Sequence, residues 1–355
     1  MRVCKRILLA LSGLLGVVLL LAAALFAYLT ITEFRPEPTE PITVEQGTDR
    51  SLDGKSFTVL SWNVGYCGLG AQSDFFMDGG STVRPEDQSV IAQNLSGIET
   101  LLADTDADFL LLQEVDSDSK RSYNVDEAAA LRERLARPSA YALNFSCQYV
   151  PYPLPTIGKV HSGLLTLSRF AITEASRISL PCPFSWPVSI ANLKRCLLVT
   201  RIPVAGTGRE LVLVNLHLEA YDDGTGKLEQ SKQLRDFLAT EYAAGNYVVA
   251  GGDWNQVFPR SEELWPNTHR SLWTPGSLDP SELPAGWRYV WDPSVPTCRL
   301  LNQPFDPADT ENTQYYVIDG FLVSPNLEVE QIETIQASFA FSDHNPVLLS
   351  LTLGD

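Results

Sequence analysis

An uninterrupted apolar segment near the N-terminus limits what this chain can fold into more than any other feature of its sequence. Residues 7–32 read ILLALSGLLGVVLLLAAALFAYLTIT and contain no charged side chain. At about 1.5 Å of rise per residue, a helix of this length can cross the hydrocarbon layer of a bilayer. The small residues 22–24 would suit a signal-peptide cleavage site, but the apolar run continues past them to Ile31. We therefore expect residues 1–32 to form an uncleaved transmembrane anchor.

The charges on either side of this segment predict its orientation. Arg2, Lys5 and Arg6 precede it, whereas Glu33 and Glu37 follow it. Because basic flanking residues tend to stay on the cytoplasmic side, we expect a cytoplasmic N-terminus and a C-terminal domain outside the cytoplasm. The chain would then be a single-pass membrane protein.

The remainder of the chain is strongly acidic. The whole chain has a formal net charge of -17, and the only charges before Glu33 are basic, so the part that follows is more acidic still. An acidic surface repels phosphate backbones at long range, which argues against a domain that recruits duplex DNA through a basic footprint. With 45% hydrophobic residues, the chain can bury a large core.

Residues 33–54 differ in composition from the segments on both sides. They are rich in Pro, Glu and Thr and show no apolar periodicity, which predicts an extended, solvated linker. Residues 55–355 contain no second linker, internal repeat or low-complexity tract. The sequence therefore predicts one large domain over residues 55–355, which we expect to be monomeric.

Five cysteines follow the apolar segment, and their odd number and irregular spacing match neither a zinc site nor a dense disulfide scaffold. They are Cys67, Cys147, Cys182, Cys196 and Cys298. Cys182 and Cys196 flank a Pro-rich stretch and are the pair most worth testing for a disulfide. Buried free thiols are an equally good interpretation of the same residues.

Short runs rich in Val, Ile and Leu recur along the predicted domain and indicate β-strands. They span residues 57–64, 108–112, 163–168, 196–204, 210–218, 247–250, 315–324 and 346–353. Apolar residues spaced three or four apart predict helices over 90–102, 126–136 and 228–242. Because some strands follow each other directly and others are separated by a helix, the pattern favours a layered α/β sandwich of mixed sheets.

Polar side chains suited to metal or phosphate chemistry stand in or after several of these runs. Asn63 ends the run VLSWN, and its amide can bind a hard cation or orient a carboxylate. Glu114 follows FLLLQ, where a cation or hydrogen-bond donors must offset the desolvation of its carboxylate. His217 lies in LVLVNLHL, where a lone histidine is more often a core residue. Of these three residues, Glu114 is the first candidate for a magnesium ligand, because its carboxylate needs a cation or donors as partners.

Three further clusters follow towards the C-terminus. In VVAGGDWN, Asp253 and Asn255 alternate and would point the same way on an extended strand. Asp319 lies within YVIDGFLV, where a buried carboxylate needs a partner such as a histidine. Asp343 and His344 stand side by side directly before the last predicted strand. Each cluster by itself is weakly specific for function.

Taken in order, the six clusters resemble the endonuclease/exonuclease/phosphatase superfamily, which includes deoxyribonucleases, abasic-site endonucleases, neutral sphingomyelinases and inositol polyphosphate phosphatases. The resemblance covers residues 56–353 and includes the elements Gln-Glu-Val, Asn-x-His, Gly-Asp-x-Asn, Ile-Asp and Ser-Asp-His. It implies an α/β fold, a four-layer sandwich of two mixed β-sheets flanked by helices. It also implies that the six clusters gather at one edge around Mg²⁺ or Mn²⁺.

The resemblance implies a metal-dependent hydrolase of phosphoesters and a role for each residue. Glu114 and Asn63 would hold the metal, together with Asp343. Such an ion would stabilise the negative charge that develops during displacement at phosphorus.

The remaining residues would act on water and phosphate. By similarity, Asp253 would align or deprotonate the attacking water, and Asn255 and His217 would bind phosphate oxygens. His344, oriented by Asp319, would stabilise the transition state or serve as the acid or base, a role suited to an imidazole near neutral pH.

The nature of the substrate stays open. The chain lacks the Trp-x-Gly-Asp and Cys-Asp-Arg elements of the inositol phosphatase branch, which disfavours that branch. An outward-facing anchor favours lipid headgroups, extracellular nucleic acid or small phosphodiesters, and His161 is a candidate for the wall of the substrate pocket. A non-catalytic binding module on the same fold and an adhesin-like ectodomain are the alternatives from other functional classes.

Overall fold

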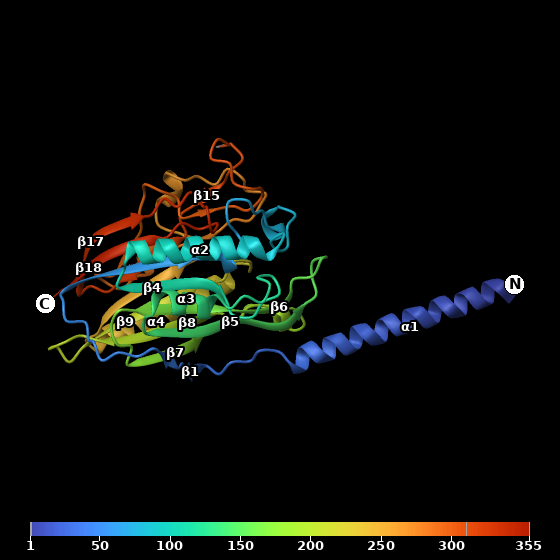
Figure 1. Cartoon of the computed structure of the whole chain (residues 1–355), viewed down its shortest axis with the longest axis horizontal. Helices are drawn as coiled ribbons and strands as arrows, with labels where there is room; N and C mark the ends of the chain where they lie inside the picture. The colour runs from blue at the N-terminus through green and yellow to red at the C-terminus, as the bar shows by residue number, and fades with distance from the viewer. Residues whose placement is uncertain (1, 310, 355) are drawn as a thin grey trace.

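The computed structural model describes residues 2–309 and 311–354, which form a long N-terminal helix and an α/β domain (Figure 1). Helix α1 (Arg2–Ile31) projects from the domain. Within the described part of the chain, it is the one helix long and apolar enough to cross a membrane. The helix expected from the apolar segment is therefore present.

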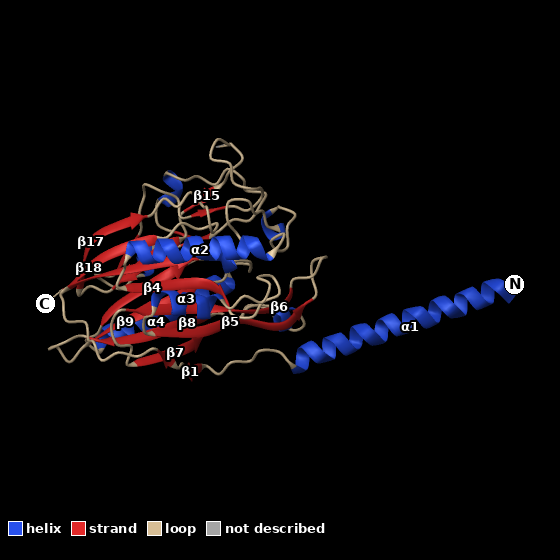
Figure 2. Cartoon of the chain, viewed as in Figure 1, coloured by secondary structure: helices blue, strands red, loops and turns tan. Residues whose placement is uncertain are grey.

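Two seven-stranded mixed sheets make up the domain (Figure 2). In the first sheet β9 and β10 are parallel and all other neighbours are antiparallel. Its order is β1 (Thr39–Pro41), β7 (Glu174–Ser179), β8 (Cys196–Pro203), β9 (Glu210–His217), β10 (Tyr247–Asp253), β16 (Asp319–Val323) and β13 (Arg288–Val290).

The second sheet repeats this plan, with β3 and β4 as its parallel pair and antiparallel pairing elsewhere. Its order is β17 (Leu327–Thr334), β18 (Val347–Leu353), β3 (Ser56–Asn63), β4 (Phe109–Asp116), β6 (Gly158–Ser168), β5 (Ser139–Val150) and β2 (Val44–Glu45).

Short elements complete the domain. Two small ladders pair β11 (Gln256–Val257) with β12 (Gly276–Ser277), and β14 (Cys298–Arg299) with β15 (Tyr315–Tyr316). The 3₁₀ turns are η1 (Gly65–Cys67), η2 (Phe76–Asp78), η3 (Val188–Ala191), η4 (Ser261–Glu263) and η5 (Pro280–Glu282).

Helices cover the outer faces of both sheets. They are α2 (Gln88–Thr105), α3 (Glu127–Leu135) and α4 (Thr225–Ala243). Helix α2 begins where the side chain of Asp87 accepts a hydrogen bond from the backbone N–H of Ser89, which caps an otherwise unpaired donor. Its apolar residues recur at helical spacing on one face and pack on the second sheet: Ile91, Leu95, Ile98 and Leu102. Leu234 and Leu238 of α4 pack on the first sheet in the same way.

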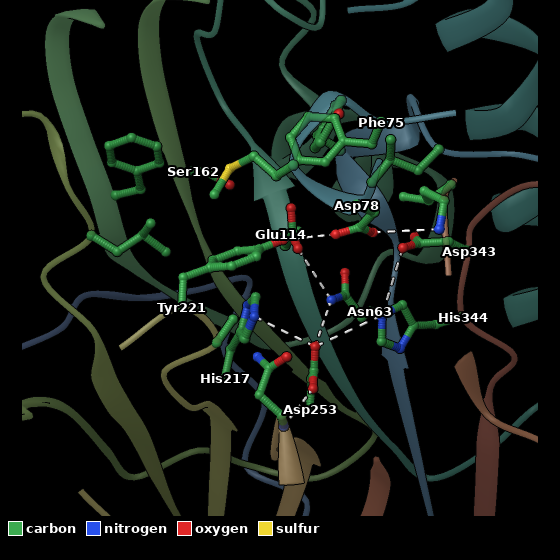
Figure 3. Close-up of a pocket in the computed structure, with 18 of the residues that line it drawn as sticks. Asn63, Phe75, Asp78, Glu114, Ser162, His217, Tyr221, Asp253, Asp343 and His344 are labelled. Atoms are coloured by element: carbon green, nitrogen blue, oxygen red, sulfur yellow. Dashed lines mark hydrogen bonds and ion pairs between the residues drawn. The ribbon is translucent and has the colours of Figure 1, made fainter. Parts of the chain in front are cut away.

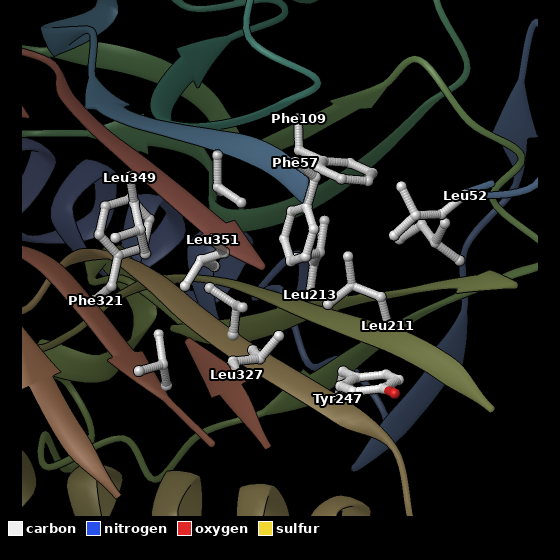
Figure 4. Packing of buried hydrophobic residues seen from close by; sticks show 14 of the residues in the cluster. Leu52, Phe57, Phe109, Leu211, Leu213, Tyr247, Phe321, Leu327, Leu349 and Leu351 are labelled. Atoms are coloured by element: carbon white, nitrogen blue, oxygen red, sulfur yellow. The ribbon is translucent and has the colours of Figure 1, made fainter. Parts of the chain in front are cut away.

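Alternation of side chains along each strand explains why the sheets stack. On β3, Phe57 and Val59 point into the apolar core between the two sheets (Figure 4). Leu60 and Trp62 on the same strand point the other way, towards α2 and α3. The result is helix, sheet, sheet and helix in four layers, which confirms the expected fold.

The expected helices and strands are present, although the run 315–324 forms two strands, β15 and β16. Among strands of five or more residues, three were missed: β5, β7 and β17. Strand β5 was not anticipated because Ser, Asn and Gln interrupt its apolar pattern. Strand β17 lies at the edge of its sheet, where exposed acidic side chains such as Glu328 and Glu330 hide the alternation.

All six cysteines lie within the described residues and are free thiols, so Cys182 and Cys196 form no disulfide.

Residues 33–54 are mostly exposed, but they pair with the domain instead of forming a free spacer. Strand β1 pairs with β7, β2 pairs with β5, and Leu52 is buried in the core between the sheets. Hydrogen bonds to sheet edges hold a segment that has few apolar side chains of its own. This segment therefore runs along the domain and keeps the end of α1 beside it.

Candidate active site

The carboxyl ends of the two parallel strand pairs meet at one end of the sandwich. Asn63 lies in register with Gln113 on neighbouring strands of the second sheet, and His217 lies in register with Asp253 in the first. These ends border one cavity (Figure 3). Seven residues singled out in the sequence line it: Asn63, Glu114, His217, Asp253, Asn255, Asp343 and His344.

A buried amide bridge joins the two sheets beneath this cavity. Gln113 Nε2 donates to Asn215 Oδ1 at 2.8 Å, and Asn215 Nδ2 donates to the carbonyl oxygens of Leu112 and Leu165 at 3.1 Å. Because a buried amide is costly unless its hydrogen bonds are made, this pairing fixes how the sheets align. Glu114 follows Gln113 directly and His217 lies two residues after Asn215, so the alignment also constrains the spacing between Glu114 and His217.

A β-bulge directs Glu114 into the cavity. The register between β4 and β6 shifts between Leu112 and Val115, and Glu114 has a positive φ of 53°. A bulge leaves one residue out of the ladder and turns its side chain away from the regular alternation. Glu114 thereby faces the cavity while Arg121 Nη2 lies 3.8 Å from its Oε2.

Gly252 allows β10 to approach β9 closely just before Asp253. Its φ is 152°, and a Cβ at this position would lie 1.9 Å from the carbonyl oxygen of Leu216. No side chain larger than hydrogen fits there. The glycine therefore sets the position from which the Asp253 carboxylate enters the cavity.

Asn63 links two of the acidic side chains. Its Nδ2 donates to Asp253 Oδ2 at 3.0 Å and to Glu114 Oε1 at 3.2 Å, while its Oδ1 accepts the backbone N–H of Gly65 at 3.0 Å. Of the two functions considered for this amide, orientation of carboxylates is the one that its hydrogen bonds serve here.

His344 is held on both sides by buried groups. Its Nδ1 pairs with Asp319 Oδ2 at 2.8 Å, and its backbone N–H donates to Ser342 Oγ at 3.2 Å. The other ring nitrogen, Nε2, faces the cavity 3.8 Å from both Asp253 Oδ2 and Asp343 Oδ2. Burial alone would lower the pKa of His344, but the charge of Asp319 raises it well above its usual value. Asp319 lies behind the histidine, as a positioning group.

His217 approaches the same carboxylate from the opposite side. Its Nε2 lies 3.4 Å from Asp253 Oδ2, and its Nδ1 is buried without a hydrogen-bond partner. Burial and the nearby charge of Arg195 lower its pKa, which favours a neutral imidazole. The two histidines therefore differ in charge although both flank Asp253.

Several acidic side chains lie together in the cavity, where they are shielded from water. Burial raises the pKa of Asp253 to about 7 and that of Asp343 to about 6, and neighbouring carboxylates add to both shifts. The two guanidinium groups in the lining are already engaged, because Arg121 pairs with Asp116 and Arg195 with Glu219. Carboxylate oxygens such as those of Glu114, Asp253 and Asp343 are the donors that Mg²⁺ and Mn²⁺ prefer. The donor set therefore fits a divalent ion of this kind.

Two side chains differ from expectation. Asn255 has a positive φ of 50° and follows the end of β10, so it does not simply alternate with Asp253 along a strand. Its backbone N–H donates to Asp253 Oδ1 at 2.9 Å, and it reaches the cavity from this turn. His161 does not line the cavity, whereas its neighbour Ser162 does, because successive residues of β6 face opposite sides. The assignment of His161 to the pocket wall was wrong.

Sequence reasoning missed other polar groups of the site. Asp78 on η2 accepts hydrogen bonds from Tyr221 Oη at 3.2 Å and from the backbone N–H of Leu301 at 3.4 Å. Burial raises its pKa to about 7, and Asp343 contributes to the shift. Arg121 stacks over the ring of Tyr66 at 3.8 Å. All lie in loops or short 3₁₀ turns without periodicity, so no sequence pattern could have located them.

The fold and the site together define a class: a four-layer α/β sandwich with an acidic, histidine-flanked cavity at the strand ends. The sequence model of the endonuclease/exonuclease/phosphatase family matches residues 60–344, and the chain belongs to this family. Members of the family are typically phosphoester hydrolases, and they generally use divalent metal ions.

Solved structures resemble the domain at low sequence identity. An endonuclease/exonuclease/phosphatase from Beutenbergia cavernae aligns with a TM-score of 0.57 at 19% identity, over 84% of this chain and 72% of that one. TDP2 from C. elegans aligns at 0.51 and 17%, over 85% and 76%. The catalytic domain of human Nocturnin aligns at 0.50 and 14%, over 88% and 97%. No curated protein matches in sequence. These likenesses support the fold alone.

Proposed function

We propose that this chain is a divalent-metal-dependent phosphodiesterase, anchored in a membrane through residues 1–32 with its domain outside the cytoplasm. One observation carries the proposal. Asp253 lies within hydrogen-bonding or ion-pairing reach of Asn63, His217 and His344, in a cavity that also contains Glu114 and Asp343. Five separate segments of sequence supply these groups, and metal-assisted displacement at phosphorus needs all of their chemical types together.

The metal ligands in this scheme are Glu114 and Asp343, with Asn63 holding Glu114 in place. Their oxygen atoms suit Mg²⁺ or Mn²⁺. When bound, the ion would supply a Lewis acid that stabilises charge on a phosphoryl oxygen.

The chain's own residues would perform the proton transfers and the positioning. Asp253 aligns the attacking water and accepts its proton, while Asn255 and the neutral His217 donate hydrogen bonds to phosphate oxygens. His344, charged through its pairing with Asp319, stabilises the transition state or donates a proton to the leaving oxygen.

The charges around α1 support the proposed orientation. Lys5 and Arg6 precede the apolar part of the helix, and Glu33 follows it. A domain outside the cytoplasm would meet phosphodiesters of lipids, nucleic acids or small molecules.

Turnover of bis(p-nitrophenyl) phosphate by the full chain in detergent tests this function. Asp253→Asn and His344→Ala should each lower kcat by about 100-fold or more, since an acid–base group contributes about 10² to 10⁴ in rate. EDTA should abolish turnover, and added Mg²⁺ or Mn²⁺ should restore it. Asp236→Asn, which removes an exposed carboxylate on α4, is the matched control.

Metal binding measured by calorimetry, without turnover of any phosphodiester, would favour a non-catalytic binding module on the same fold. Wild-type rates in both active-site variants would contradict the proposed mechanism.

A further inference from the structure

The end of α1 is packed against the catalytic domain. Leu29 is only 3% exposed and lies in a cluster with Phe145, Val150 and Ile190, and Leu25 packs at the edge of this cluster. The other residues between Val3 and Ile31 are exposed, except for the half-buried Gly16 and Thr30, as a segment surrounded by lipid would be. The last turns of α1 therefore belong to the domain's own apolar packing.

Polar contacts fix this arrangement directly after the helix. Lys194 Nζ lies 3.0 Å from Glu33 Oε1, and Ser189 Oγ donates to the same oxygen at 3.2 Å. Trp186 Nε1 donates to Thr30 Oγ1 at 3.2 Å. The side chain of Glu33 is largely buried, so its ion pair is shielded from water. The direction of α1 is thereby set relative to the cavity.

The same apolar cluster forms one wall of the catalytic cavity. Phe145, Ile157 and Leu193 line the cavity and also belong to, or pack against, the cluster that holds Leu29. The cluster that packs around Leu29 therefore also borders the cavity. Figure 1 shows α1 leaving the domain from the end at which β5 connects to β6.

Exposed apolar side chains surround this end of the domain. Outside α1, eight large hydrophobic side chains are exposed among the described residues. Four of them lie in the two segments next to the anchor, Tyr152 and Leu154 between β5 and β6, and Trp186 and Val188 before and within η3. A fifth, Met77, belongs to η2, where Phe76 contacts Tyr152 with ring centroids 6.1 Å apart. We call these five residues the rim.

The segments that carry most of the rim contain no charge. Residues 138–158 and 178–193 lack Asp, Glu, Lys and Arg, in a chain where 19% of residues are charged. An apolar, uncharged surface enters a membrane interface without desolvating charges, and Trp and Tyr favour that depth of the bilayer. Exposed to water, the same surface would be an aggregation hazard.

We propose that the rim lies in the bilayer interface beside α1, so that the cavity opens onto lipid headgroups and the substrate is a phosphodiester lipid of the same membrane. The substrate part of this inference rests on the proposed hydrolase function. Hydrolysis adds water across one P–O ester bond: the water oxygen bonds to phosphorus, and the leaving alkoxide takes up a proton. The reaction needs no other co-reactant. Apolar wall residues such as Phe75 and Ile157 would contact the part of the lipid nearest its headgroup.

Quenching of tryptophan fluorescence by brominated lipid tests the position of the rim without using activity. The full chain is placed in vesicles of phosphatidylcholine with brominated acyl chains. Trp186 is 62% exposed, whereas the other six tryptophans are buried or half-buried, so Trp186→Phe should remove most of the quenched emission. Equal quenching in the wild type and in Trp186→Phe would overturn the inference, whatever the enzyme's activity.

Substrate preference is tested with two phosphodiesters in parallel. Vesicles of phosphatidylcholine, phosphatidylglycerol and sphingomyelin in equal parts are compared with bis(p-nitrophenyl) phosphate in solution. The double variant Leu154→Ser/Trp186→Ser should lower the ratio of lipid turnover to soluble turnover by about 10-fold. Leu264→Ser, which changes another exposed leucine outside the rim and the cavity lining, should leave this ratio unchanged.

The outcomes separate the two proposals. Turnover of the soluble phosphodiester without turnover of any vesicle lipid would overturn the lipid substrate and leave the hydrolase function intact. Quenching that depends on Trp186 without turnover of either substrate would overturn the hydrolase function and keep the rim in the membrane. Cross-linking between copies through the rim, without quenching, would assign the surface to a second copy of the chain.

Discussion

Asp319→Asn changes a single charge behind the active site while keeping the size and shape of the side chain. Asp319 Oδ2 pairs with His344 Nδ1 at 2.8 Å, and both side chains are almost completely buried. An asparagine can still form a hydrogen bond at this position, but it cannot raise the pKa of the histidine through its charge. The variant therefore isolates the electrostatic contribution of this pair.

The size of the effect follows from the type of bond that is weakened. A hydrogen bond to a charged group contributes about 1.5–3 kcal/mol, and about 1.4 kcal/mol corresponds to a tenfold change in rate. We expect kcat/KM for bis(p-nitrophenyl) phosphate to fall by about 10- to 150-fold. The alkaline limb of the pH–rate profile should move to lower pH, because His344 would lose its proton more easily.

A double variant tests whether Asp319 acts through His344. In a His344→Ala background, Asp319→Asn should cause little further loss, since the group that it positions is already absent. Thermal unfolding of each variant controls for damage to the fold. Multiplicative losses in the double variant, or a wild-type pH profile for Asp319→Asn, would refute the assignment of Asp319 as the partner that charges His344.

Two further predictions concern stability. Gly252→Ala should lower the free energy of unfolding by roughly 1–3 kcal/mol, because its Cβ would overlap the Leu216 carbonyl; urea unfolding measures this, with Gly47→Ala, where a Cβ meets nothing, as the control. Without metal, unfolding free energy should decline as pH rises from about 4 to 7, since Asp78, Asp253 and Asp343 keep protons in the folded state at pH values where the unfolded chain has lost them. Added Mg²⁺ should therefore raise the melting temperature more at pH 7.5 than at pH 5, and an equal rise at both would contradict this.

The sequence determined the parts of this protein that depend on periodicity and residue type. The long apolar run predicted α1, short runs rich in Val, Ile and Leu predicted strands such as β3 and β4, and strand-end polar residues predicted seven members of the cavity. These features are local, because side-chain direction in a regular helix or strand follows directly from its repeat. The order of the six clusters was specific enough to identify the family.

Only the tertiary structure decided which way side chains point where that repeat is broken. The bulge at Glu114 and the positive φ at Asn255 are not visible in any apolar pattern, and the alternation that turns His161 away from the cavity depends on which face of β6 meets it. Contacts between distant loops likewise brought Asp78 to the site and set Trp186 beside the end of α1. Such contacts arise from the packing of the whole chain, so no local sequence signal specifies them.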